Sequence, residues 1–329
     1  MARPVTIFTG QWADLSLEEI CKTAKDMGYD GLEIATWGHL DCHKAANDPS
    51  YVKEIKDTLS RYGLECIALG AHLAGQCVGD LWDTRLDGFV PVEYAGNPVE
   101  IRHWAIEEMK DTAKAAKAMG CTVVTGFMGS AIWKYWYSFP QTSEVMIENA
   151  YKEQVELWTP IFDVFDECGV KFALEVHPTE IAFDYYTTQR LLKVFDNRPT
   201  LGLNFDPSHL IWQGVNPTIF LQDFIDRVYH VHMKDTAVNL DGRSSILGSH
   251  LTFGDMRRGW NFVSLGHGDV DFDKIIRVLN SANYQGPLSV EWEDSGMDRV
   301  FGATEACEFV KKINFNKSDV AFDNALKSE

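Results

Sequence analysis

Eight short apolar segments alternate along this chain with segments that have the pattern of amphipathic helices. The apolar segments, each predicted as a strand, are residues 4–10, 31–37, 65–73, 121–127, 171–177, 201–206, 227–235 and 287–294. Strands that alternate with helices form a parallel sheet with the helices packed outside it. Eight such units in 329 residues match a (β/α)8 TIM barrel with extended loops on its C-terminal face. We therefore predict an α/β fold, with one barrel domain at 1–316 and a polar C-terminal tail at 317–329.

Residues at the ends of the predicted helices support this division. Ser16 and Glu19 have the spacing of a capping box, and Asp48 followed by Pro49 is typical of a helix start. The predicted helices are 16–28, 48–63, 99–120, 144–169, 188–196, 217–226, 271–283 and 304–314. A doubly wound open sheet is the alternative. It has little support as a dinucleotide-binding fold, because no GxGxxG follows the first strand.

Charge and composition narrow the classes of partner. The formal net charge is −18, which disfavours binding to nucleic acid. The sequence has no apolar run of the ~18–20 residues that a membrane span needs, and its first residues lack a signal-peptide pattern. The seven cysteines include no CxxC pair, which favours reduced thiols. We therefore expect a cytoplasmic protein with a small-molecule substrate.

Acidic and imidazole side chains stand at the ends of four successive strands in the second half of the chain. They are Glu175, Asp206, His232 and Glu291. The carboxyl ends of barrel strands meet at one mouth, so these side chains should converge there. Three unpaired carboxylates in one place repel one another, and a divalent cation would hold them together. The mixed oxygen and nitrogen set suits Mn²⁺ best, and Fe²⁺, Co²⁺, Zn²⁺ or Mg²⁺ are alternatives.

Further polar and aromatic side chains near the same strand ends are candidates for substrate contact. The predicted substrate-binding residues are His209, His72, Trp37, Arg257 and Glu293. Glu33, Arg258, His250 and His267 are weaker candidates, and His230, Lys234 and Asp235 are expected beside the ligands or as structural neighbours. His177 follows Glu175 by two residues and therefore shares its face, which makes it a candidate acid or base. Each has a structural alternative, such as capping, an ion pair or loop packing.

Aromatic residues in or near the loops at that end suit a sugar, whose C–H faces stack on rings. These residues are Trp12, Trp37, Trp133, Tyr135, Trp136 and Tyr137. Packing within the loops is the alternative for at least half of them.

Four motifs carry a resemblance to a known family. LEVHP (174–178), NFDPSH (204–209), HVHMKD (230–235) and SVEWED (289–294) resemble the sugar phosphate isomerase/epimerase superfamily. This superfamily of xylose isomerase-like barrels includes ketose 3-epimerases, inosose isomerases and dehydratases, and relatives that act on 3-keto-glycosides. The resemblance spans nearly the whole chain. It implies that Glu175, Asp206, His232 and Glu291 bind one divalent metal, and that the two glutamates exchange the substrate proton.

The resemblance implies a metal-dependent epimerase or isomerase of a keto-sugar or related polyol ketone, acting through a metal-stabilised enediolate. His177, as an additional base, favours an alternative on the same site. That alternative is a lyase, either an inosose-type dehydratase or a 3-keto-glycoside or C-glycoside deglycosidase. In the epimerases, an arginine soon after the strand-seven histidines aids substrate binding, but here the corresponding stretch has its arginine, Arg243, at a displaced position. The long insertions at 74–98 and 236–270 also depart from the epimerase pattern and indicate a larger or differently shaped pocket. Arg257 or Arg258 could substitute for the displaced arginine.

Two other classes of protein have less support from the sequence. A DNA-repair nuclease on this barrel would use three zinc ions and more histidines, and a non-catalytic sugar-binding barrel would not need four intact ligands. A homo-oligomer and a small partner subunit both remain open.

Overall fold

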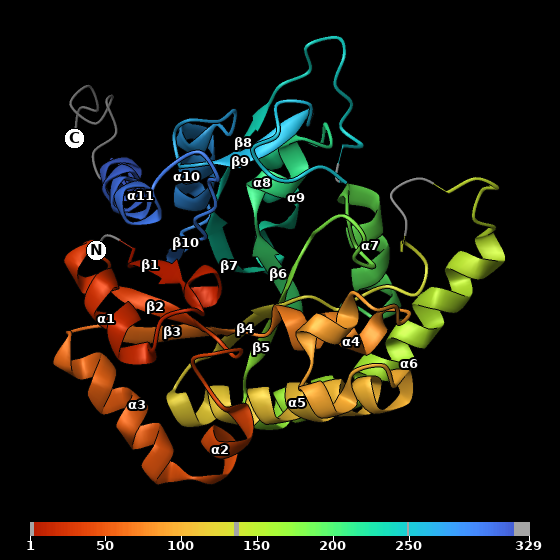
Figure 1. Ribbon diagram of the computed structural model, residues 1–329, viewed down its shortest axis with the longest axis horizontal. Helices are drawn as coiled ribbons and strands as arrows, with labels where there is room; N and C mark the ends of the chain where they lie inside the picture. The colour runs from red at the N-terminus through yellow and green to blue at the C-terminus, as the bar shows by residue number, and fades with distance from the viewer. Residues whose placement is uncertain (1–2, 135–137, 249, 319–329) are drawn as a thin grey trace, which may run out of the picture.

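A computed structural model of the protein describes residues 3–134, 138–248 and 250–318 (Figure 1). Eight strands form a closed parallel barrel in the order β1-β10-β7-β6-β5-β4-β3-β2. They are β1 (Val5–Phe8), β2 (Gly31–Ala35), β3 (Glu65–Gly70), β4 (Val123–Gly126), β5 (Lys171–Glu175), β6 (Leu201–Phe205), β7 (Val228–Met233) and β10 (Leu288–Val290). The predicted (β/α)8 barrel is therefore confirmed, and each predicted strand contains one barrel strand.

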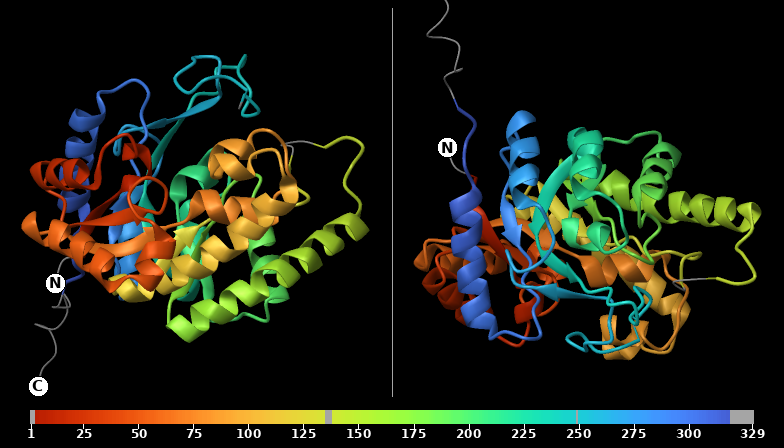
Figure 2. Two further views of the ribbon diagram at one scale, coloured as in Figure 1. Left: turned by 60° about the horizontal axis from the view of Figure 1, so that its bottom comes forward. Right: turned by 90° about the horizontal axis from the view of Figure 1, so that it is seen from above.

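Helices surround the barrel at the predicted positions. They are α1 (Leu17–Asp26), α3 (Pro49–Arg61), α5 (Pro98–Met119), α6 (Glu144–Cys168), α7 (Tyr185–Val194), α9 (Pro217–Phe224), α10 (Phe272–Ser281) and α11 (Arg299–Ile313). Ser16 and Glu19 form the expected capping box, and Asp48 caps α3 ahead of Pro49. In Figure 2 α5 and α6 run side by side along one flank. Within the described residues, no helix is long and apolar enough to cross a membrane.

Short helices occupy several segments for which the sequence predicted loops or strand ends. They are η1 (Thr9–Trp12), α2 (Cys42–Asn47), α4 (His72–Gly79), η2 (Leu86–Phe89), η3 (Val92–Tyr94), α8 (Pro207–Ile211) and η4 (Ile225–Arg227). The insertion at 74–98, expected to be loop-like, therefore begins within a helix, because only one residue separates the start of α4 from the end of β3. Because α4 starts at His72, that side chain is carried into the barrel mouth.

The long insertion at 236–270, expected to be a polar loop, contains a β-hairpin. β8 (Asp235–Val238) pairs antiparallel with β9 (Trp260–Val263). The Asp235 carboxylate accepts hydrogen bonds from the backbone N–H groups of Thr236, Gly266, Gly268 and Val270. At Gly268 a Cβ atom would lie 2.3 Å from Asp235 Oδ1, so only glycine allows this approach. Asp235 is therefore a structural residue that anchors the hairpin.

Arg258 holds the loop between the two hairpin strands. Its guanidinium lies over the rings of Phe253 and Trp260, at 4.2 and 4.5 Å from their centroids. It donates hydrogen bonds to the carbonyl oxygens of Gly248, Leu251 and Trp260. The cation and aromatic rings in this segment thus form a small core of their own, a long-range packing that the polar composition did not indicate.

Candidate metal centre

The four predicted ligands lie together at the carboxyl end of the barrel. Glu175 is the last residue of β5, Asp206 follows β6 as the cap of α8, His232 lies in β7 and Glu291 follows β10. All four are buried, and one potential ligand atom from each lies within 4.8 Å of the others. Ser208 N–H donates to Asp206 Oδ1 at 2.8 Å, which leaves Oδ2 for the group. The short connections out of these parallel strands position the set.

The atoms of this group lack ordinary partners. Asp206 Oδ2, His232 Nδ1 and Glu291 Oε2 are buried and make no well-oriented hydrogen bond within the described parts of the chain; their near neighbours are one another, Glu175 and His209. His232 Nδ1 lies 3.1 Å from Glu175 Oε2 and 3.0 Å from Glu291 Oε2. Buried polar atoms are normally paired, and converging unpaired donor atoms are what a cation requires. The residues therefore fit a divalent cation held by three carboxylates and one imidazole.

Glu33 in β2 sets the orientation of His232 from behind. Its carboxylate lies 3.0 and 3.1 Å from His232 Nε2, and it accepts further hydrogen bonds from His230 Nε2 at 2.8 Å and Ser289 Oγ at 2.7 Å. Burial raises the pKa of Glu33, but His232 and His230 outweigh this and hold the pKa well below its usual value. An ionised Glu33 keeps a proton of His232 on Nε2, so Nδ1 is the nitrogen that faces the carboxylates and would bind a metal once it has lost its own proton.

Glu33, His230 and His232 also lie close enough together to hold a metal. The oxygens of Glu33 already accept hydrogen bonds from four side chains, the fourth being the hydroxyl of Thr125. The four-residue group has free acceptor atoms, whereas Glu33 has its lone pairs engaged. We therefore treat Glu33 as the residue that orients His232.

Glu291 lies beside a buried cation. Lys234 Nζ is 3.2 Å from Glu291 Oε1 and 3.1 Å from Glu293 Oε1, and it lies 4.3 Å from the ring centroid of Phe262. Gln11 Nε2 donates to the same two carboxylate oxygens at 2.8 and 3.1 Å. Burial raises the pKa of Glu291, but Lys234 and His232 together outweigh it and lower the pKa to about 2. Glu291 is thus a carboxylate throughout the neutral range.

Imidazoles surround Glu175 on the other side of His232. His209 Nε2 lies 3.2 Å from Glu175 Oε1 and from Asp206 Oδ2, and His72 Nε2 lies 3.3 Å from Glu175 Oε2. Burial lowers the pKa of His209, but Asp206 and the hydrogen bond to Glu175 raise it to about 9. The ring centroid of His177 is 4.2 Å from that of His209. Burial and the nearby charge of His209 lower the pKa of His177 to about 3, so this imidazole is neutral at pH 7.

The structure brings most of the predicted substrate residues to this mouth. His72, His177, His209 and Glu293 lie as described above, and Trp37 packs edge-on to His72 with ring centroids 6.1 Å apart. Arg257 does not join them, because it is exposed on the hairpin loop and paired with Asp255.

Several weaker candidates lie elsewhere. Arg258 is part of the hairpin core, Arg243 and His250 are exposed, and His267 pairs with Glu305. Trp12 is buried beneath Arg299, and Trp133 lines a cavity described below. Tyr135, Trp136 and Tyr137 lie outside the described residues, as does the predicted tail from 319 onward.

Sequence reasoning missed four residues around the ligands. They are Gln11, Phe262, Thr125 and Ser289. Gln11, which lies in η1, directly follows the predicted strand at 4–10, so the rule that singled out the ligands at other strand ends could have found it. Thr125 and Ser289 are polar residues within short buried strands, which is itself a signal of a polar partner inside the barrel.

A parallel eight-stranded barrel with converging metal-ligand residues at its carboxyl end defines a class of TIM-barrel enzymes. A model of the xylose isomerase-like TIM barrel family matches residues 21–313, so the chain belongs to that family.

Two relatives found by sequence show different extents of similarity. An uncharacterised protein of Bacillus subtilis (strain 168), YfiH, is 25% identical over 325 residues, covering 92% of this chain and 97% of its own length. The inosose dehydratase of Clostridium perfringens (strain ATCC 13124) is 30% identical over 151 residues, covering 45% of this chain. The match spans 49% of the dehydratase, about half its length.

Two solved structures share the fold. The 3-keto-D-glucoside 4-epimerase YcjR of E. coli has a TM-score of 0.66 and 17% identity, covering 94% of this chain and 99% of its own. The IolI protein, solved with a bound zinc atom, has a TM-score of 0.62 and 20% identity, covering 94% of this chain and 96% of its own. At these identities the likeness is one of fold. The proteins similar to this chain thus include one named as a dehydratase and one named as an epimerase, and one structural neighbour was solved with a bound zinc atom.

Proposed function

We propose that this protein is a divalent-metal-dependent epimerase or isomerase of a keto-sugar or a related polyol ketone. The observation that carries the proposal is the buried group of Glu175, Asp206, His232 and Glu291, with unpaired donor atoms facing one another. A cation bound there would act as a Lewis acid on the substrate ketone and stabilise the negative charge that develops on its oxygen. We favour Mn²⁺ because three carboxylates and one imidazole form a mostly oxygen set.

Two carboxylates on opposite sides of His232 supply the proton transfer. Glu175 and Glu291 approach His232 Nδ1 from β5 and from the end of β10, at 3.1 and 3.0 Å. A substrate carbon held between them would lose a proton to one glutamate and regain it from the other. Return to the opposite face of the same carbon gives an epimer, and return to the neighbouring carbon gives an isomer. Lys234 keeps Glu291 ionised, while His209 and His72 bind Glu175.

His177 and His209 favour a second candidate, a lyase at the same site. Their adjacent rings place two more acid–base groups beside Glu175, beyond what a two-glutamate exchange needs. Such a pair could assist departure of a hydroxyl or glycosidic oxygen from the carbon next to the enolised position. The dehydratase name of the partly matched relative is consistent with this candidate.

Proton NMR in D₂O of the Mn²⁺-loaded protein tests the proposal. The substrates are D-fructose, D-psicose, a 2-keto-inositol and a 3-keto-glucoside, with a Glu291→Gln variant as control. We expect deuterium at a carbon next to the ketone and formation of an epimer or isomer, both lost in the variant. Loss of water or release of an aglycone would transfer the assignment to the lyase. No exchange with any of the four, in protein that holds one metal per chain, would refute the substrate class.

A further inference from the structure

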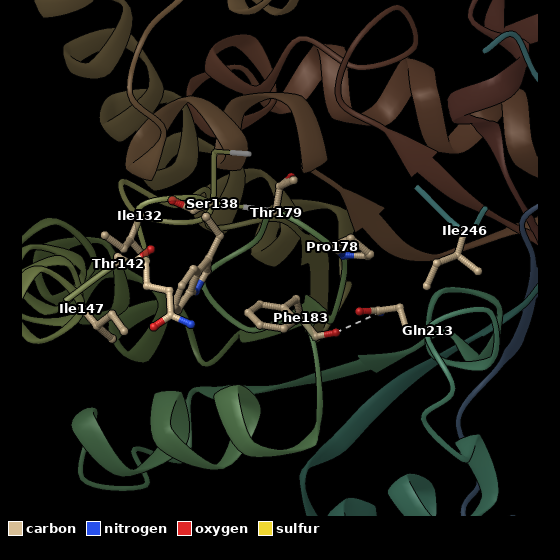
Figure 3. Close-up of a pocket in the computed structure, with 11 residues that line it drawn as sticks. Ile132, Ser138, Thr142, Ile147, Pro178, Thr179, Phe183, Gln213 and Ile246 are labelled. Carbon is tan, nitrogen blue, oxygen red and sulfur yellow. Dashed lines mark hydrogen bonds between the residues drawn. The ribbon is translucent and has the colours of Figure 1, made fainter. Parts of the chain in front are cut away.

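A cavity of about 470 Å³ opens among the loops at the carboxyl end of the barrel (Figure 3). Its walls come from the loop after β4, the start of α6, the turn after β5, the end of α8 and the hairpin loop. Figure 3 shows Ile132 and Ile147 on one side, Gln213 and Ile246 on the other, and Phe183 between them. A cavity of this size lies in the range of small-molecule sites.

Two connections join the cavity to the catalytic groups. Pro178 and Thr179 line it and directly follow His177, whose Nδ1 lies 2.6 Å from the Pro178 carbonyl oxygen. Gln213 Nε2 donates to the carbonyl oxygen of His209 at 2.6 Å and to that of Phe183 at 3.0 Å. A ligand in the cavity would therefore lie next to the His177–His209 side of the metal centre.

The turn that forms one wall is held in place. Thr179 has a φ of +79°, a left-handed conformation that is costly for a β-branched residue and persists only when its surroundings enforce it. The next residue, Glu180, is buried and accepts the backbone N–H groups of Met128 and Gly129 at 2.8 and 2.7 Å. This carboxylate ties the turn after β5 to the loop after β4. Two of the segments that line the cavity are thus tied to each other.

The lining combines hydrophobic side chains with polar ones, the polar ones being Ser138, Gln141, Thr142, Thr179 and Gln213. Ile132, Trp133, Ile147, Phe183 and Ile246 supply hydrophobic side chains, and none of the described lining residues carries a charge. Trp133 and Phe183 pack edge-on with ring centroids 5.4 Å apart. An aromatic ring placed against this hydrophobic part would gain apolar contact area along its whole face, more than a small alkyl group would gain.

We propose that this cavity binds an apolar, aromatic substituent of the substrate, so that the substrate is an aryl glycoside rather than a free monosaccharide. This inference rests on the proposed function, because it assumes that the sugar occupies the metal centre. Gln213 and Thr179 would contact the polar junction between the two parts.

Isothermal titration of the Mn²⁺-loaded protein with phenyl and methyl D-glucosides, both anomers of each, tests the inference. These glucosides carry no ketone, so binding is measured without turnover. We expect a phenyl glucoside to bind about tenfold or more tightly than the matching methyl glucoside, because burying one or a few apolar groups contributes that factor. The preference should fall below about threefold in Phe183→Ala and in Ile147→Asp. It should persist in Ile219→Asp, an exposed isoleucine of α9 outside the cavity.

The outcomes separate the two proposals. Equal affinities, no detectable binding of a phenyl glucoside, or a preference that survives both cavity variants would overturn the aryl-group site. A phenyl preference in a protein that exchanges no ketone proton would uphold the site and refute the reaction. Deuterium exchange that is equally efficient with methyl and phenyl 3-keto-glucosides would uphold the reaction and refute the site.

Discussion

Replacing Glu33 by glutamine tests how the barrel prepares His232 for a metal. The Glu33 carboxylate receives the Nε2–H of His232 at 3.0 and 3.1 Å and also binds His230. A glutamine side chain has nearly the same shape, but it has one acceptor oxygen and no charge. The variant keeps the volume at the centre of the barrel while it weakens the hold on the His232 tautomer.

The expected loss of metal affinity is about 10- to 100-fold, the usual cost of removing a carboxylate behind a histidine ligand. This corresponds to roughly 1.4–2.7 kcal/mol. The matched control is Ser289→Ala, which removes one hydrogen bond to Glu33 Oε2 but leaves both carboxylate contacts with His232. We expect the control to lose less than about threefold, because the lost hydrogen bond reaches His232 only through Glu33, which keeps its charge and its other three hydrogen-bond donors.

Isothermal titration with Mn²⁺ measures the affinities, and circular dichroism checks that each variant is folded. Affinity within threefold of wild type in Glu33→Gln would refute the proposed orienting role. A loss far beyond 100-fold in a folded variant would also contradict it, because Glu33 would then be a direct ligand in the group with His230 and His232.

Three further predictions concern titration and proton transfer. Burial and the charge of Asp80 raise the pKa of Glu180 from about 4.5 to about 8. The folded state therefore favours the protonated acid, and the protein loses stability as the pH rises from about 4.5 to about 8. Glu180→Gln should be more stable than wild type by roughly 2 kcal/mol or more at pH 8 but not at pH 4, in urea unfolding. Burial lowers the pKa of His232, but the surrounding carboxylates raise it well above its usual value. Because a metal would displace that proton, Mn²⁺ binding should release about one proton at pH 7, and the affinity for Mn²⁺ should increase from pH 6 to 8. Calorimetric titration in buffers of different ionisation enthalpy measures the proton release. At saturating Mn²⁺, Glu291→Gln should slow deuterium exchange into the substrate, measured by NMR, by ~10²–10⁴-fold, and His177→Asn should slow it by less than tenfold. A larger loss in His177→Asn than in Glu291→Gln would favour the lyase.

The barrel and the group of candidate ligands could be predicted from the sequence, because both follow from the order of strands and helices along the chain. Eight apolar segments separated by amphipathic ones specify a parallel barrel, and the carboxyl ends of its strands must meet. Glu175, Asp206 and Glu291 each stand within one residue of a strand end. Their meeting point therefore follows from topology, without knowledge of any side-chain conformation.

Contacts between distant segments were not accessible in this way. Glu33 could equally have formed a surface ion pair, and only barrel closure places it against His230 and His232 from β7. Arg257 lies in the segment after the seventh predicted strand, and was therefore expected near the site. The β8–β9 hairpin instead places it on an exposed loop, where it pairs with Asp255. Its neighbour Arg258 is buried by aromatic rings up to five positions away. Loop direction depends on such packing, which no strand-end rule contains.

Anomalous diffraction from crystals grown with Mn²⁺ tests the central claim most directly, because two groups compete and share His232. We predict one peak per chain, on the Nδ1 side of His232 and bounded by Glu175, Asp206 and Glu291. A peak on the Nε2 side, between Glu33 and His230, or no peak in protein saturated with the metal, would contradict the assignment.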